Sequence, residues 1–144
     1  MQGYSVKNPQ GGESYTVNYS LSGAVVNDMA INTRDTSLVI LMNSTRDGSM
    51  VIDLPRNLID AKAGSGDDQF IVLVDDTYTN FHENKTDTDR DLTIPFAAGS
   101  SRVEIIGTQV VPEFDHLASL VFGISLLTLV TISYRLKIHG LSSR

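Results

Sequence analysis

The strongest constraint on how this chain can fold is a stretch without a formal charge, residues 117–134, which is followed by Arg135 and Lys137. A helix rises about 1.5 Å per residue and the hydrocarbon core of a bilayer is roughly 30 Å thick, so about 20 residues cross it. A buried helix of a soluble core usually keeps a polar stripe, and no face of this stretch carries a charge. The sequence therefore predicts one transmembrane α-helix over residues 117–134, with Arg135 and Lys137 as the membrane stop.

The two signs of charge are divided along the chain. Residues 1–116 hold all 17 acidic residues and eight basic ones, whereas residues 135–144 hold three basic residues and no acidic one. Positive charge flanks the cytoplasmic end of a membrane span. We therefore expect a single-pass protein of the cell membrane, with an extracellular N-terminal domain and a basic cytoplasmic tail, residues 135–144. The acidic domain excludes nucleic acid as a partner, because phosphate binding needs clustered bases.

A short motif precedes the span. Residues 111–116 contain Pro112, Glu113, Phe114 and Asp115 in succession. With the apolar stretch and the basic tail, this motif resembles the PEFG-type (PEFG-CTERM) sorting signals of archaeal, in particular thaumarchaeal, surface proteins, with Asp115 in place of the glycine. The resemblance implies processing by a membrane-embedded archaeosortase-like enzyme that transfers the domain to a lipid anchor. Because aspartate lacks the backbone freedom of glycine near a scissile bond, retention of the helix as a simple anchor is an equally open alternative.

The N-terminal residues do not show the pattern of a secretory signal, which combines a basic region with an apolar stretch of roughly 7–15 residues. Residues 1–12 are polar and glycine-rich, and we expect them to form a flexible lead or linker. Export of the acidic domain then leads us to expect that the natural chain begins upstream of Met1. A cytosolic domain with a tail anchor is the alternative, since tail-anchored proteins also lack signal peptides.

Residues 13–110 show the pattern of an extracellular β-domain. Eight apolar or alternating runs are separated by turn-forming residues, and they cover residues 15–21, 25–31, 37–42, 50–54, 70–74, 78–81, 91–96 and 102–106. Short strands at this spacing predict a mainly β domain, an immunoglobulin-like antiparallel β-sandwich of about eight strands. Only residues 54–62 have a helix-like pattern, which we interpret as one or two turns between the sheets. The domain also resembles the β-sandwich domains that often precede PEFG signals.

Residues that carry catalytic chemistry are sparse. The chain has no cysteine, which excludes thiolate catalysis, zinc–cysteine sites and the copper centre of cupredoxins. His82 is the one histidine well inside the domain, and no nucleophile or orienting acid stands at a recognisable spacing from it, so we expect a partly exposed strand residue. No HExxH, GxSxG or glycine-rich phosphate motif occurs. The sequence therefore predicts a protein that is not an enzyme.

Acidic loops supply the candidates for a metal site. Asp87, Asp89 and Asp91 place carboxylates at every second residue, and Asp67 and Asp68 lie in a glycine-containing loop. Hard cations such as Ca²⁺ take about six to eight oxygen ligands, so a calcium site where these loops converge is one interpretation. Solvated acidic loops are the other, because the first run lacks the glycine and the terminal glutamate of an EF-hand loop. No other cofactor is expected.

Three asparagines lie in Asn-X-Ser/Thr sequons and are candidates for glycosylation: Asn18, Asn43 and Asn84. They agree with an extracellular location. The function that the sequence favours is a non-enzymatic surface module, structural or adhesive, whose partners are membrane lipid and other surface proteins or glycans.

Two other classes of function stay open. The first is an extracellular module that binds glycans or Ca²⁺, for which the candidates for an aromatic platform are Tyr4, Tyr15, Tyr19, Tyr78 and Phe81. On strands, most of these rings would serve the core instead. The second is a membrane-anchored subunit of a surface enzyme.

Overall fold

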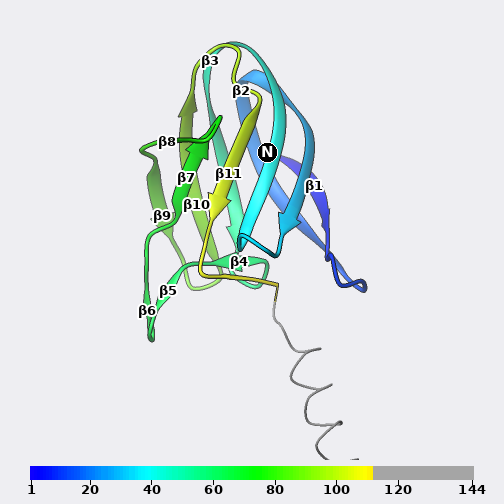
Figure 1. Cartoon of the computed structure of the whole chain (residues 1–144), viewed down its shortest axis with the longest axis vertical. Coiled ribbons are helices and arrows are strands. Elements are labelled where there is room, and N and C mark those ends of the chain that lie inside the picture. The colour runs from blue at the N-terminus through cyan, green and yellow to red at the C-terminus, as the bar shows by residue number, and fades with distance from the viewer. Residues whose placement is uncertain (112–144) are drawn as a thin grey trace, which may run out of the picture. The chain divides into compact units, whose positions relative to one another are not determined.

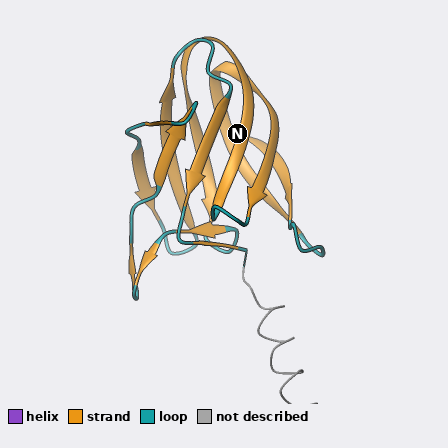
Figure 2. Ribbon diagram, in the orientation of Figure 1, coloured by secondary structure: helices purple, strands orange, loops and turns teal. Residues whose placement is uncertain are grey.

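The computed structural model describes residues 1–111, which form antiparallel strands and turns with no helix among them (Figures 1 and 2). In chain order the strands are β1 (Gln2–Lys7), β2 (Ser14–Asn32), β3 (Ser37–Pro55), β4 (Ile59–Asp60), β5 (Lys62–Ala63), β6 (Gly66–Asp67), β7 (Ile71–Val74), β8 (Thr77–Tyr78), β9 (His82–Lys85), β10 (Asp89–Phe96), β11 (Arg102–Ile106) and β12 (Gln109–Val110). The prediction of a mainly β, antiparallel domain is confirmed.

A long hairpin of β2 and β3 is the frame of this domain. Each strand has 19 residues, and the two pair along nearly their whole length. The first part of β3 also pairs with β11, and its last part pairs with β10. The hairpin therefore belongs to two layers, with the strand orders β2-β3-β11-β7-β8 and β1-β2-β3-β10-β9. Through this hairpin the eight-stranded sheet folds back on itself into a β-sandwich-like arrangement (Figure 1).

Two glycines shape the bend of the hairpin. Ser22 pairs with Ser49 and Ala24 with Ser44, so residues 45–48 of β3 bulge opposite Gly23 alone. Gly23 has a φ of 87°, a left-handed conformation that favours glycine. A Cβ atom on Gly48 would overlap the carbonyl oxygen of Ser22. Bulges bend and twist a strand, and this one turns each long strand from one layer into the other.

The core lies between the two layers and follows the alternation of the strands. Along β10, Leu92, Ile94 and Phe96 are buried, whereas Thr93 and Pro95 are exposed. The buried apolar side chains come from both layers, from β4 and from residues that directly precede the short strands β4 and β7. They include Val17, Met29, Leu38, Ile40, Ile52, Leu58, Ile59, Phe70, Val72, Val103 and Ile105. Burial of one such side chain contributes about 1.5–3 kcal/mol, so this alternation is the main source of stability.

The expectation that residues 1–12 form a flexible lead is wrong for Gln2–Lys7. This segment is β1, and it pairs with the first part of β2 in an unbroken antiparallel register. Val6 is fully buried and Tyr4 packs against the core, so the segment gains both a hydrogen-bonded partner and an apolar contact. Alternation over so few residues is a weak signal in a polar, glycine-rich sequence.

The number and extent of the strands also differ from the prediction. The runs at 15–21 and 25–31 are one strand, β2, because Gly23 lies at a bulge and not at a hairpin turn. The runs at 37–42 and 50–54 are likewise both parts of β3. Bulges and tight turns use the same glycine and aspartate residues, so composition alone does not separate them.

The helix-like segment 54–62 is a turn followed by a short strand. The N–H of Leu58 donates to the carbonyl of Pro55 at 2.9 Å, and β4 begins at Ile59. Leu58 and Ile59 are both fully buried in the core. Nothing in residues 1–111 forms a helix of the length and hydropathy that a bilayer crossing requires. The predicted span, residues 117–134, lies outside the described residues.

Gly48→Ala tests the bend. We expect the substitution to lower the free energy of unfolding by about 2 kcal/mol or more, because the new methyl group meets main-chain atoms that cannot move aside. Urea unfolding followed by circular dichroism measures the change. Gly66→Ala is the matched control, because the nearest atom to its new Cβ would be the Ala63 carbonyl oxygen at 3.7 Å. Equal stability of the two variants would contradict the role of Gly48.

Candidate functional site

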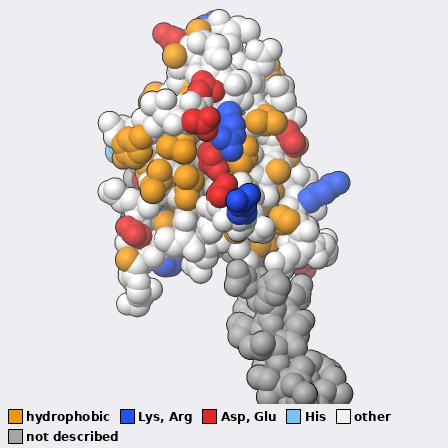
Figure 3. Space-filling model, viewed as in Figure 1, with side chains coloured by type: hydrophobic (Ala, Val, Ile, Leu, Met, Phe, Trp, Pro, Cys, Tyr) orange, Lys and Arg blue, Asp and Glu red, His pale blue; other side chains and the backbone are white. Residues whose placement is uncertain are grey.

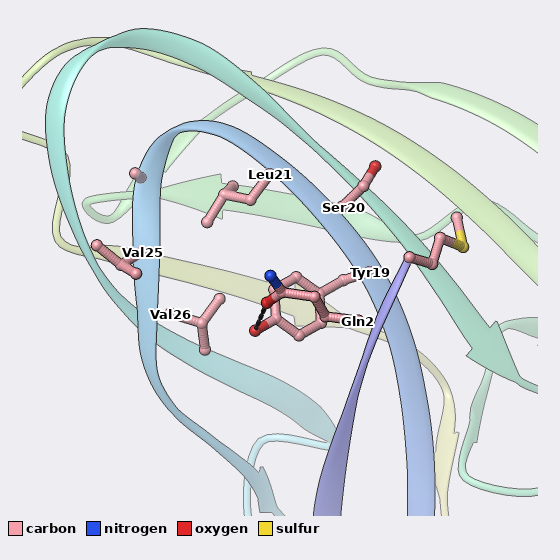
Figure 4. A pocket seen from close by; sticks show the side chains of 8 residues that line it. Gln2, Tyr19, Ser20, Leu21, Val25 and Val26 are labelled. Atoms are coloured by element: carbon pink, nitrogen blue, oxygen red, sulfur yellow. Dashed lines mark hydrogen bonds between the residues drawn. The ribbon is translucent and has the colours of Figure 1, made fainter.

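A hollow opens where the N-terminal end of β1 meets the bend of β2 (Figure 4). It has a volume of about 290 Å³ and is lined by Met1, Gln2, Tyr19, Ser20, Leu21, Ala24, Val25 and Val26. The Tyr19 hydroxyl donates to Gln2 Oε1 at 3.0 Å and ties the two strands together beside it. We call it the bend hollow. Its walls are mainly aliphatic and carry no charged side chain, so it suits an apolar side chain and not acid–base chemistry.

A second hollow, of about 570 Å³, adjoins the same bend and shares Leu21, Ala24 and Val25 with the first. Ser22 and Gly23 of β2 and Thr45 and Arg46 from the bulge of β3 complete its lining. Val25 is 65% exposed, more than Leu41, Ile71 or Tyr78. The bend therefore presents aliphatic side chains to solvent from a rigid, paired strand.

Arg90 of β10 is the centre of a buried ionic network. Its side chain is fully buried and ion-pairs with Glu83 of β9 through Nε, at 2.5 Å, and with Asp60 of β4 through Nη1, at 2.9 Å. Nη1 also donates to the carbonyl of Ala61 at 2.8 Å, and Nη2 donates to that of Asp68 at 2.6 Å. The guanidinium thus joins segments that are 7–30 residues away in sequence. These contacts give the network a structural role.

The surroundings of Arg90 keep it charged. Burial alone would lower the pKa of Arg90, but the hydrogen bonds that Arg90 donates to Glu83 and Asp60 outweigh burial and raise the pKa. Burial would raise the pKa of Asp60, and the bonds from Arg90 and from the N–H of Ala61 reverse this and lower it. The guanidinium also lies 4.4 Å from the ring centroid of Phe70, a cation–π contact.

Asp67, a candidate calcium ligand, belongs to the outer part of this network. Its carboxylate pairs with Arg56 and with Lys62, each at 2.8 Å. Hydrogen bonds from Arg56, and to a smaller extent from Lys62, hold the pKa of Asp67 well below its usual range. Arg56 and Lys62 also reach Asp60, so the two cations bridge the buried and the exposed carboxylates. Asp67 therefore already has cationic partners within the protein.

Two of the other candidate calcium ligands, Asp68 and Asp89, also contact protein groups. The Asp68 carboxylate accepts from the N–H of Gln69 at 2.8 Å, and that of Asp89 accepts from the hydroxyl of Thr88 at 2.5 Å. Asp87 is an exposed turn residue, and Asp91 stands opposite Asp53 in the sheet. In the part of the chain that the structure describes, no three His, Asp or Glu side chains are grouped so that they could hold a metal ion. Calcium binding stays a prediction without a site there.

The sequence did not single out Asp53, the acid with the least favourable surroundings. It lies in a row across β2, β3, β10 and β9 formed by Asn18, Asp53, Asp91 and Asn84. Within residues 1–111, its Oδ1 is buried without a hydrogen-bond partner. Burial raises the pKa of Asp53, and the negative charges of Asp89 and Asp91 raise it further. The alternation of β3 and β10 places these acids on one face, but only the register brings Asp53 opposite Asp91.

The three sequon asparagines are exposed in the structure. Asn18 lies on β2, Asn43 on β3 and Asn84 on β9. His82 is exposed on β9 opposite Thr93, and the prediction of an exposed strand histidine is confirmed. Each sequon side chain is therefore accessible to solvent in the folded domain.

The candidate aromatic rings do not share one face. Tyr19 is buried in the core, and Tyr4, Tyr15 and Phe81 are partly buried against it. Tyr78 of β8 is 61% exposed, on the edge of the other layer. The prediction that most of these rings serve the core is confirmed.

The outer face of the β7–β11 layer carries a few exposed apolar side chains beside a line of charges (Figure 3). Leu41 is 43% exposed and Ile71 is 48% exposed. Arg102 pairs with Asp76 at 2.8 Å and with Glu104 at 3.0 Å. Isolated apolar residues next to ion pairs are usual on protein surfaces, so this face is not a strong candidate site.

The sorting-like motif Pro112, Glu113, Phe114 and Asp115 lies outside the described residues. Comparison with models of protein families, with curated proteins and with solved structures finds no match for this chain.

Arg90→Met tests the buried network. We expect the free energy of unfolding to fall by about 3–5 kcal/mol, because Asp60 and Glu83 lose their buried cation. Lys85→Met is the control: Lys85 lies 3.9 Å from the same Glu83, but its side chain is 40% exposed, and the expected change is below about 1 kcal/mol. Urea unfolding measures both. A loss for Arg90→Met no larger than that of the control would refute the structural role.

Asp53→Asn tests the unfavourable carboxylate through pH. Because folding raises the pKa of Asp53, the folded state binds its proton more tightly than the unfolded state, and the ionised group destabilises the fold at neutral pH. We expect the variant to melt at a higher temperature than the parent at pH ~7, and the gain to vanish below the ordinary aspartate pKa of about 3.9.

Asp67→Asn is the control with the opposite sign. The pKa of Asp67 is lowered in the folded state, so its carboxylate stabilises the fold above its ordinary pKa, and this contribution is lost as the pH falls. The control should therefore melt at a lower temperature than the parent at neutral pH, with a difference that shrinks in acid. Differential scanning calorimetry of both variants at two pH values measures the effect, and a loss of stability in Asp53→Asn at neutral pH would contradict the argument.

Proposed function

We propose that this chain is a non-enzymatic cell-surface module, structural or adhesive, held outside an archaeal membrane by its C-terminal segment. The observation that carries the proposal is the charge-free stretch 117–134 between an acidic domain and a basic tail. The resemblance of Pro112, Glu113 and Phe114 to a PEFG signal supports the same location. Processing by an archaeosortase-like enzyme and simple retention of the helix are both compatible with it.

The structure of the domain supports a role in display or contact. The buried charges of Arg90, Asp60 and Glu83 are engaged with one another and with main-chain carbonyls, which is the pattern of a structural network. The exposed sequons at Asn18 and Asn43 suit an extracellular environment. The immunoglobulin-like form of the sandwich stays a prediction.

Of the alternative functions, a binding module gains support from one feature, the bend hollow. Its aliphatic lining suits an apolar side chain of a partner, whereas a glycan platform would need exposed rings gathered on one face. We therefore favour a protein partner over a glycan.

Labelling of single cysteines tests the location, because residues 1–144 contain no cysteine. Ser65→Cys lies in an exposed turn of the domain, and Ser143→Cys lies in the basic tail. A membrane-impermeant maleimide should label the first variant on intact cells, and the second only after the membrane is permeabilised. Labelling of the tail on intact cells, or of Ser65→Cys only after permeabilisation, would exclude the proposed orientation.

A further inference from the structure

One edge of the folded sheet is open along β2. β1 pairs with β2 from Ser14 to Tyr19, and beyond this point, within residues 1–111, β2 pairs only with β3. Residues 24–32 are therefore an edge strand of the β2-β3-β11-β7-β8 layer. Alternate residues of an edge strand turn their N–H and C=O groups away from the sheet, where another strand can pair with them.

The other edges of the two layers are shorter or protected by charge. β8 has two residues, and β9 has four, including Glu83 and Lys85. β1 has six residues and ends at Lys7. Short edge strands and edge lysines prevent pairing with other chains. Residues 24–32 contain neither lysine nor proline, and Asp28 is their one charged residue. A bulge between Val26 and Asp28 is the one irregularity of this edge.

The bend hollow lies at the start of this open edge. Ala24, Val25 and Val26 of β2 line the hollow, so a strand that pairs with residues 24–32 has the hollow beside one of its ends. In recognition by strand addition, main-chain hydrogen bonds supply affinity and pockets for alternate side chains supply specificity. The open edge and the aliphatic hollow supply these two elements side by side.

Charge limits the kind of strand that fits. Asp28 is exposed and accepts a hydrogen bond from the Tyr4 hydroxyl at 2.7 Å, and residues 1–111 hold 15 acidic and eight basic residues. A second copy of this chain would bring like charges together, and two β2 edges paired about their centre would place Asp28 opposite its own copy. A basic segment is attracted by both features.

We propose that residues 24–32 of β2 accept an extended, basic and aliphatic segment of another polypeptide by strand addition. The segment runs antiparallel to β2, places an aliphatic side chain in the bend hollow and carries lysine or arginine near Asp28. The inference rests on the proposed function in one respect, because it takes the partner to be a neighbouring surface protein. Strand addition itself does not depend on the orientation in the membrane.

The experiment uses the full chain in detergent micelles and a fluorescent nine-residue peptide of alternating valine with lysine or threonine, Lys-Val-Thr-Val-Lys-Val-Thr-Val-Lys. Fluorescence anisotropy measures its dissociation constant. Two further peptides carry N-methyl groups, one on all valines and the other on the intervening residues. In an added strand only alternate N–H groups face the host strand, so one methylated peptide should bind at least about tenfold more weakly, and the other within about twofold of the parent. Equal binding of both methylated peptides would overturn the proposal.

Two variants locate the binding on the protein. Val25→Lys places a charge at the bend hollow, and Ile71→Lys places the same charge on the outer face of β7, where the side chain is also exposed. We expect the first to weaken binding at least about tenfold and the second to change it less than about twofold. Equal effects, or no binding of the unmethylated peptide, would refute the acceptor edge. The cysteine labelling at Ser65 reports separately on the proposed function.

Discussion

The fold of the region between β3 and β10 depends on the buried guanidinium of Arg90. β4 to β9 are strands of two to four residues, too short to be stable through their ladders alone. A guanidinium without partners is strongly unfavourable in an interior without water. The fold is therefore stable only when Asp60, Glu83 and the carbonyls of Ala61 and Asp68 all contact Arg90. Replacing such a network with apolar residues is often neutral for stability. Its contribution is therefore to select one arrangement of these short segments over others.

The second constraint is the continuity of the β2–β3 hairpin through both layers. Because each long strand changes layer at the bulge opposite Gly23, the layers are joined covalently at the bend and packed together through the core. Among the described residues, the same geometry leaves part of β2 without a neighbouring strand on one side. β1 covers only the part of β2 before the bend, so the later part of the strand forms a sheet edge and the aliphatic residues of the bend remain partly in water. The candidate site and the stability of the fold thus have one structural origin.

The sequence predicted the parts of this fold that depend on local periodicity. The alternation of Leu92, Ile94 and Phe96 with polar neighbours identified a strand and the face that it buries. The same reasoning missed β1, whose alternation spans few residues, and it read the glycines of the bulge as turns. For the candidate sites, the sequence named Asp67, Asp87 and Asp89 from their spacing but assigned no role to Asp53 or to the hollow.

By itself the sequence determined the antiparallel β class, most of the inward-facing residues, the absence of thiol chemistry and the position of the one charge-free stretch. These follow from composition and from period-two patterns, which are properties of short segments. Only the tertiary structure decided which partners the charged residues have: Asp67 lies between two cations, whereas Asp53 faces Asp91 with an unpaired oxygen. It also decided which sheet edge stays open. The physical reason is that strand register and the closure of two layers depend on contacts between residues far apart in the chain, and a local pattern does not specify them.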